Sequence, residues 1–249
     1  MDKQIRKKEK MNNGMKVYCM FEQTGTFKTE FEILGYEAYD VDIENNFGKT
    51  DYQINIFDEI EACYQGKESF FDRIKSEDLI MAFFPCTYFS TLSQLCMRYS
   101  SNTMKKLSLR EKTEKIIKRI SEREYYYSIL LKLYTIAIEK KLRLIIENPY
   151  SLDSYLKSIF IPPTFVDKNR MIRGDYVVKP TAYWFINIDK KNGYTHQEDK
   201  AQLRTQNRRY ATKGQRSIDR SLISSDYAKN FIHDFILGDN IKIIQTKLF

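Results

Sequence analysis

The chain is poor in histidine and cysteine, and it has no long apolar run. Two of its 249 residues are histidine and four are cysteine, and the cysteines show neither C-x-x-C nor Cys/His spacing. This scarcity predicts no metal site. No apolar segment reaches the length of a membrane span, and the charged first ten residues are unlike a signal peptide. We therefore expect a cytoplasmic protein with reduced thiols and no membrane partner.

The aromatic residues and the positive charge are what the chain has in excess. It contains 18 Tyr and 16 Phe, which predicts a core rich in packed rings. Its net charge is +8, and residues 168–220 hold 13 Lys or Arg against 5 Asp or Glu, whereas the remainder is balanced. A local excess of this kind suits docking to a polyanion such as DNA. A solvated loop is the alternative.

Apolar segments of strand and helix type alternate along most of the chain. Residues 1–14 are expected to be a disordered basic lead-in, and 15–249 a single domain in which 151–215 form a small basic insert. The alternation predicts an α/β fold, with a mostly parallel sheet flanked by helices. Strands are expected over 15–21, 37–43, 51–57, 78–86, 142–149, 183–188 and 241–244. Helices are expected over 27–34, 59–75 and 224–237, with a long helix ending near 141 whose apolar face holds Tyr127, Leu130, Leu131, Tyr134 and Ile138.

Two of the predicted strands end in a reactive group. One apolar run leads to Pro85-Cys86, and the other leads to Glu147-Asn148. The carboxyl ends of parallel strands meet at one edge of a sheet, where α/β proteins bind ligands. The pattern therefore indicates a covalent catalyst with an acid beside it. The alternatives are an ordinary buried thiol, as we expect for Cys19, Cys63 and Cys96, and an ion-paired carboxylate.

These residues resemble the cytosine carbon-5 DNA methyltransferases, and most closely the short phage- or prophage-associated members. The resemblance implies a Rossmann-like fold of the S-adenosylmethionine (SAM)-dependent methyltransferases, with a reduced target-recognition region. It also implies a bacterial host or phage-infected cell as the setting. It covers the chain from about residue 15 and is carried by Pro85-Cys86-Thr87-Tyr88, Glu147-Asn148-Pro149, the Lys-x-Thr-x-x-Trp pattern of 179–184, Arg216-Ser217 and Arg220-Ser221.

The resemblance implies a role for each residue of the two strand ends. Cys86 would add as a thiolate to carbon 6 of cytosine, so that carbon 5 can accept a methyl group from SAM. A thiolate requires a depressed pKa at Cys86, supplied by nearby cations or a helix N-terminus. Glu147 would hydrogen-bond the base, and Asn148 would hold the loop. A base in duplex DNA would have to be flipped out to reach them.

The cofactor loop has a single glycine, Gly25, where the family has more. The resemblance implies that the helix N-terminus at Thr26 binds the SAM carboxylate. Asp42 would accept hydrogen bonds from the ribose, and Asn55 would reach the adenine. Turn or helix-cap roles are the alternatives for both residues. The remaining cofactor-binding candidates are Phe21, Glu22, Phe27, Pro85 and Ser221.

Two arginine pairs compete to bind the substrate's phosphates, because either could form a clamp. One pair is Arg170 and Arg173, and the other is Arg208 and Arg209; Ser90 and Lys179 complete the expected substrate contacts. The strandedness of the DNA stays open. So do two other functions, an inactive methyltransferase-like protein that binds nucleic acid or a host protein, and a methyltransferase acting on RNA or nucleotides.

Overall fold

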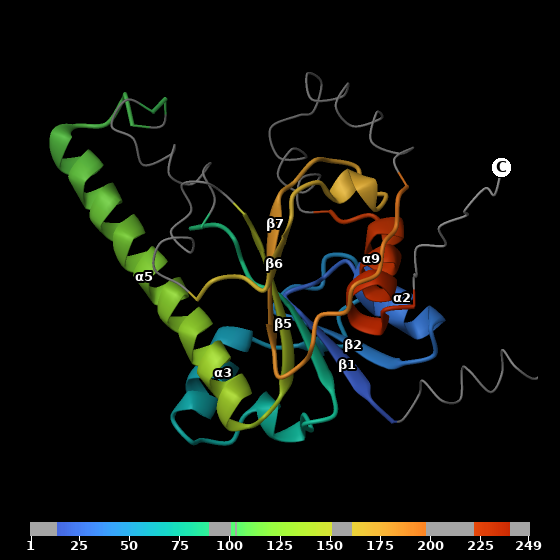
Figure 1. Ribbon diagram of the computed structural model, residues 1–249. Helices are drawn as coiled ribbons and strands as arrows, with labels where there is room; N and C mark the ends of the chain where they lie inside the picture. The colour runs from blue at the N-terminus through green and yellow to red at the C-terminus, as the bar shows by residue number, and fades with distance from the viewer. Residues whose placement is uncertain (1–13, 90–100, 103, 151–160, 198–221, 240–249) are drawn as a thin grey trace, which may run out of the picture.

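A seven-stranded sheet forms the centre of the computed structural model, which describes residues 14–89, 101–102, 104–150, 161–197 and 222–239 (Figure 1). The strands are β1 (Lys16–Met20), β2 (Glu37–Asp42), β3 (Tyr52–Gln53), β4 (Leu79–Phe83), β5 (Arg143–Pro149), β6 (Phe165–Asp167) and β7 (Thr181–Ile186). The helices are α2 (Thr26–Ile33), α3 (Ile56–Tyr64), α5 (Leu109–Glu139) and α9 (Ser225–Phe231). Shorter helical segments are η1 (Phe70–Arg73), η2 (Arg170–Ile172) and the π-helical η4 (Ile232–Leu237).

The strand order is β3-β2-β1-β4-β5-β7-β6. Strands β3, β2, β1, β4 and β5 pair in parallel, whereas β7 pairs antiparallel with both β5 and β6. The order of the first five positions is that of a Rossmann-like sheet, which confirms the predicted mostly parallel α/β architecture. The chain reverses its direction of travel across the sheet between β1 and β4. The carboxyl ends of these two strands therefore form the switch point at which such sheets bind ligands.

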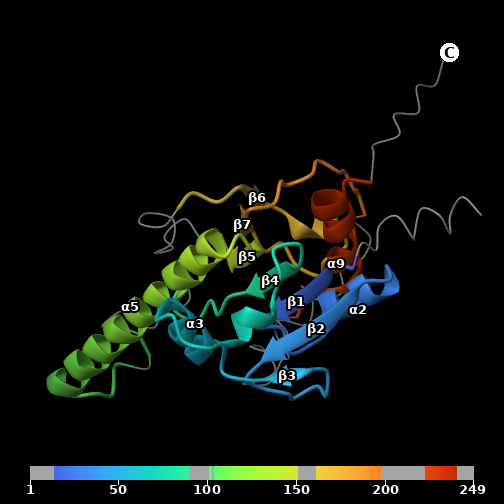
Figure 2. The same ribbon diagram turned by 90° about the horizontal axis from the view of Figure 1, so that it is seen from below.

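Helices cover both faces of the sheet (Figure 1). Helices α3 and α5 pack together on one face, and α2 and α9 pack together on the other. Figure 2, seen from below, shows the same strands crossing between these two helical layers. Neighbouring residues of a strand point to opposite faces, so Leu144 and Ile146 join one core while Ile145 joins the other.

Local sequence explains the elements that carry the site. The first four residues of β4 are apolar and buried, as expected for a central strand that is covered on both faces. Helix α5 starts at a capping box, in which the side chains of Ser108 and Glu111 each accept a hydrogen bond from the other's backbone. Helix α9 starts after Ser224, whose Oγ accepts a hydrogen bond from the Tyr227 amide.

Three predictions about these elements are wrong in detail. The strand expected over 51–57 is only Tyr52–Gln53, because Asn55 caps a helix that begins at Ile56. The helix expected over 59–75 ends at Tyr64 and is followed by the separate turn η1. Leu131 and Ile138 were expected on the buried face of the long helix but are exposed. Packing against α3 and the sheet selects a neighbouring stripe, Ile129, Leu130, Leu133, Ile136 and Ala137.

Some expected elements lie outside the described residues, namely the lead-in 1–13 and the strand expected over 241–244. The short strand β6 was not predicted, because three residues give too brief a pattern of alternation. The described helices include none with both the length and the apolar character needed to cross a membrane.

Candidate active site

The two strand ends predicted to carry reactive groups do lie side by side. Strands β4 and β5 pair in parallel, and their register sets Phe83 opposite Glu147. Cys86 follows β4 by three residues, so it lies at the edge of the sheet near which Glu147 is placed, two residues before the end of β5. The side-chain amide of Asn148 donates a hydrogen bond of 2.9 Å to the carbonyl of Phe84. Asn148 thus ties the end of β5 to the loop that carries the thiol, which is the position predicted for it.

The electrostatics of Cys86 differ from the expectation. Burial raises the pKa of the Cys86 thiol above its ordinary value; the charge of Lys179 lowers this pKa, and the charge of Glu147 raises it. The predicted depressed pKa is therefore wrong for the free protein, because desolvation outweighs the one nearby cation. Both Lys179 and Glu147 nevertheless act on the thiol, which brings three of the predicted site residues into one electrostatic environment.

Glu147 lies inside the protein against an arginine that is also buried. Its carboxylate is 3.7 Å from the guanidinium of Arg170, whose side chain is 1% exposed. Arg170 also forms a 2.5 Å ion pair with Asp175, and its guanidinium lies over the ring of Tyr227 at 4.3 Å. A DNA phosphate outside the protein does not reach a side chain in this position. The structure thus places Arg170 behind Glu147 instead of on the surface expected of a phosphate clamp.

Several polar atoms at this point have no hydrogen-bond partner within the described part of the chain. They are Glu147 Oε1, Asn148 Oδ1, and Nε and Nη1 of Arg170. Glu147 Oε1 and Arg170 Nη1 are the two atoms of the 3.7 Å ion pair, which is longer than a hydrogen bond. A buried polar atom without a hydrogen bond costs roughly 1–3 kcal/mol, so the pair has polar groups that are not fully satisfied within the fold.

Arg173, the second arginine of the predicted clamp, is held by two carboxylates. Its guanidinium is 3.0 Å from Asp167 and 2.9 Å from Asp234. Asp167 also accepts a hydrogen bond of 3.0 Å from the Tyr227 hydroxyl. These contacts connect β6, η2, α9 and η4. The positive charge of Arg173 is therefore neutralised by carboxylates within the fold. Sequence reasoning missed both acidic partners, because Asp234 is 61 residues away and Asp167 lies in β6, which was not predicted.

The predicted cofactor loop follows β1 at the switch point. Phe21 has a left-handed backbone (φ 61°), an outlier for a bulky residue, and its ring packs edge-on against Phe84 at 5.4 Å. Gly25 is also left-handed (φ 67°), and a Cβ there would come within 3.3 Å of Asp40 Oδ2. The Glu22 carboxylate accepts the Phe27 amide at 3.0 Å. The amide predicted to meet the SAM carboxylate at this helix N-terminus is thus already bonded within the chain.

Asp42 and Asn55 take the turn and cap roles that were their alternatives. Asp42 Oδ1 accepts a hydrogen bond of 2.8 Å from the Glu44 amide, and burial raises the pKa of the Asp42 carboxyl. Asn55 Oδ1 accepts the Phe57 amide at 3.2 Å and caps α3. Asp42 still ends the strand next to β1, so it lies near the loop, whereas Asn55 is committed to the helix start.

Of the other residues predicted to bind cofactor or substrate, some lie near the site and some lie outside the described residues. Pro85 is half-buried directly before Cys86, and Thr26 begins α2. Ser90, Arg208, Arg209, Ser221 and Cys96 lie outside the described residues. Sequence reasoning also missed Asp40, Asp175 and Tyr227. Asp40 alone carried a signal, because Asp in the middle of a strand is unusual.

Comparison with known proteins adds no assignment. No protein-family model matches the chain, and no curated protein matches it significantly. The chemistry of the site therefore has to be argued from its own residues.

Proposed function

We propose that the protein is a SAM-dependent methyltransferase that transfers a methyl group to carbon 5 of cytosine in DNA through a covalent adduct with Cys86. The observation that carries this proposal is the meeting of the Cys86 thiol and the Glu147 carboxylate at one edge of the sheet, with the buried guanidinium of Arg170 ion-paired behind Glu147. A nucleophile, an acid and an oriented cation at a switch point support covalent catalysis on a planar base.

The chain's own residues divide the chemistry as follows. Cys86 Sγ forms a bond to carbon 6 of the base, and the electron pair of the 5,6 double bond moves to carbon 5. Glu147 Oε1 accepts a hydrogen bond from the exocyclic amine, and Arg170, buried behind Glu147, holds this carboxylate in place through its charge. After carbon 5 has gained its methyl group, the carbon 5 proton passes to water, the electron pair of that C–H bond re-forms the 5,6 double bond, and Cys86 leaves carbon 6 as a thiolate. Because the pKa of the Cys86 thiol is raised in the free protein, the thiolate has to form once substrate has bound, with the positive charge of Lys179 stabilising it.

The residues near the end of β1 fit the cofactor in one respect, because Asp42 offers a buried carboxylate at the end of the neighbouring strand. When bound, SAM supplies an electrophilic methyl group on a sulfonium. The basic segment 168–220 supplies the positive charge that would attract the DNA backbone.

Methyl transfer from labelled SAM to mixed DNA tests the proposal. We expect label in 5-methylcytosine, its complete loss in Cys86→Ala, and a loss of about 100-fold or more in Glu147→Gln. Cys63→Ala is the matched control, since Cys63 is a free cysteine on α3 away from the strand ends, and it should keep full activity. Label that persists in Cys86→Ala would contradict the covalent mechanism.

A second candidate is a methyltransferase-like protein that binds nucleic acid without turnover. It is favoured by Glu22, which already occupies the Phe27 amide at the start of α2. This candidate predicts salt-sensitive DNA binding that survives Cys86→Ala, together with no binding of SAM. Calorimetric titration with SAM separates the two candidates, because only the enzyme requires a measurable affinity.

A further inference from the structure

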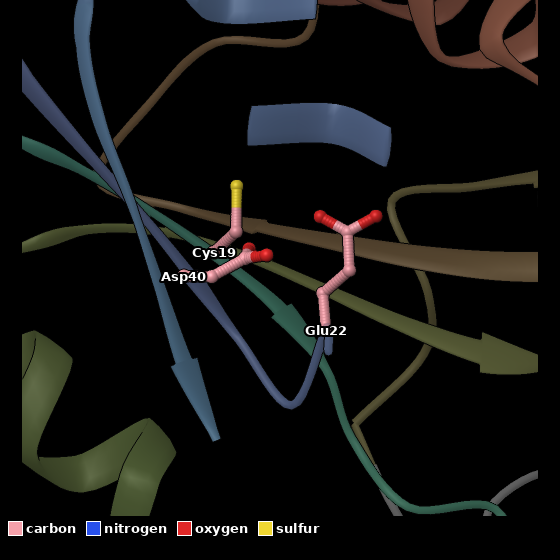
Figure 3. A group of neighbouring side chains, drawn as sticks. All are labelled: Cys19, Glu22 and Asp40. Atoms are coloured by element: carbon pink, nitrogen blue, oxygen red, sulfur yellow. The ribbon is translucent and has the colours of Figure 1, made fainter. Parts of the chain in front are cut away.

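Three ionisable side chains, one thiol and two carboxylates, lie together near the end of β1 (Figure 3). Cys19 is in β1, Glu22 follows this strand, and Asp40 is in β2 at the position that pairs with Cys19 in the parallel register. One ligand atom from each side chain, the thiol sulfur or a carboxylate oxygen, lies within 4.8 Å of the other two. All three residues are buried, so the group is closed off from solvent.

Asp40 points into this group without a partner. Its side chain is 0% exposed, and neither carboxylate oxygen has a hydrogen-bond partner within the described part of the chain. The charge of Lys28 acts on Asp40 and Cys19, but the Lys28 ammonium forms its ion pair with Asp51, at 2.6 Å. Gly25 lies against Asp40 and Lys49, and a Cβ at Gly25 would come within 3.3 Å of Asp40 Oδ2.

Such a group is costly unless something offsets its charge. Burial of an ionised carboxylate costs several kcal/mol when no counter-charge is present. Burial is also the main reason why the pKa values of Cys19, Glu22 and Asp40 are all raised. Either protons or a cation can therefore occupy the cluster. Protons would neutralise each group but would still leave Asp40 with an unused acceptor oxygen.

We propose that Cys19, Glu22 and Asp40 form a binding site for a divalent cation of the zinc type. A thiolate with two carboxylates is a donor set that Zn²⁺ accepts, whereas Mg²⁺ and Ca²⁺ take oxygen ligands alone. One oxygen of Asp40, one oxygen of Glu22 and the sulfur of Cys19 would supply three donors, and a water enclosed with the ion would supply the fourth. Donors in a tetrahedral zinc site lie roughly 3.3–3.8 Å apart, so the side chains need to draw together by about 1 Å.

The proposed ion would hold together the elements at the switch point. It would link β1, β2 and the turn that follows β1, and Gly25 lies next to Asp40 in this group. The site is distinct from the Cys86 and Glu147 pair, and its existence does not depend on the proposed methyl transfer. Its role would be to hold the loop in one conformation, since three protein ligands and no exposed face leave no place for a substrate.

Cobalt binding to a chain that keeps only Cys19 is the direct test. In the variant Cys63→Ser, Cys86→Ser and Cys96→Ser, Co²⁺ supplied to the folded protein and during refolding should give a thiolate-to-cobalt charge-transfer band. We expect one ion per chain, with the visible bands of a four-coordinate site. Further change of Cys19→Ser should abolish the charge-transfer band. Absence of this band from the variant that retains Cys19 overturns the proposal, and so does a band that survives Cys19→Ser.

Thermal unfolding supplies a readout that does not depend on the cysteines. Zinc should raise the unfolding midpoint of the chelator-treated wild-type chain, and Asp40→Asn should weaken zinc binding by at least about tenfold. Asp42→Asn is the matched control, because Asp42 is buried in the same strand but is outside the cluster; its zinc response should equal that of the wild type. A cluster occupied by protons only predicts no zinc response in any of these proteins, and this result overturns the proposal.

Discussion

The carboxylate of Glu147 and the guanidinium of Arg170 lie 3.7 Å apart, and both side chains are almost fully buried. Arg170 also pairs with Asp175, so one buried cation serves two buried carboxylates. Removal of the cation leaves both carboxylates uncompensated in the interior. We expect Arg170→Met to lower the free energy of unfolding by roughly 3–5 kcal/mol, measured by urea denaturation.

A compensating variant separates charge from packing in this experiment. Arg170→Met together with Asp175→Leu removes one ionic partner along with the cation, and it should recover part of the lost stability. Lys190→Met is a control that removes a partly exposed cation and should change stability by less than about 1 kcal/mol. A loss below about 1 kcal/mol in Arg170→Met would contradict the view that Arg170 offsets the Glu147 charge.

The Cys86 thiol should respond in opposite directions to its two charged neighbours. The charge of Lys179 lowers the pKa of this thiol, and the charge of Glu147 raises it. Lys179→Gln should therefore slow the alkylation of Cys86 near neutral pH, and Glu147→Gln should speed it, each by about twofold to tenfold. The measurement is the rate of iodoacetamide labelling at Cys86 as a function of pH, read by mass spectrometry of the peptide.

A distant charge change provides the control for the labelling rates. Lys132→Gln removes a cation that pairs with Glu61 on the α3–α5 side of the fold, and the Cys86 rate should stay unchanged. Equal rates in Lys179→Gln and Glu147→Gln would show that neither charge acts on the thiol. That result would contradict the proposed mechanism, which depends on the action of both charges on the Cys86 thiol.

The parts of the fold that sequence predicts well are those with a local pattern. Strands β1, β2, β4 and β5 were expected within a few residues of their bounds, because β1, β4 and β5 are largely apolar runs and β2 lies between clear turn signals. The meeting of Cys86 and Glu147 was also predictable, since it follows from parallel strands that end at one edge. Asn55 shows where a local pattern is not enough. A helix-cap residue and a residue at the end of a strand can have the same local sequence, and only the helix that follows tells them apart.

The site's supporting residues were not predictable from the chain alone. Arg170 was expected to bind phosphate, but it is buried between Glu147 and Asp175. An arginine in a basic segment has the same local sequence whether it faces solvent or the interior. Contacts between residues distant in sequence depend on how β6 and η2 pack against α9, and composition carries no information on that packing. The Cys19, Glu22 and Asp40 cluster was missed for the same reason, because it needs the register of β1 against β2.

Asn148 should determine how firmly the Cys86 loop is held. Its side-chain amide donates to the Phe84 carbonyl in the interior, and Asn148→Leu would leave that carbonyl unpaired. We expect a loss of roughly 1–3 kcal/mol in the free energy of unfolding, together with faster hydrogen exchange over residues 84–89. Asn230→Leu is the matched control. It removes a similar donor to the Arg173 carbonyl, so it should cost stability without changing exchange at 84–89.

The pH dependence of stability should report on Glu22 and Asp40 in the metal-free protein. Burial raises the pKa of Glu22 to about 7 and that of Asp40 to about 9. The folded chain therefore holds protons that the unfolded chain has released, and the free energy of unfolding should fall as pH rises from about 4 to about 9. Glu22→Gln and Asp40→Asn should each flatten this fall, whereas Glu37→Gln, at an exposed carboxylate, should leave it as it is. A profile that is flat over this range in the wild type would contradict the raised values, and saturating zinc should reverse the slope, because it binds the deprotonated groups.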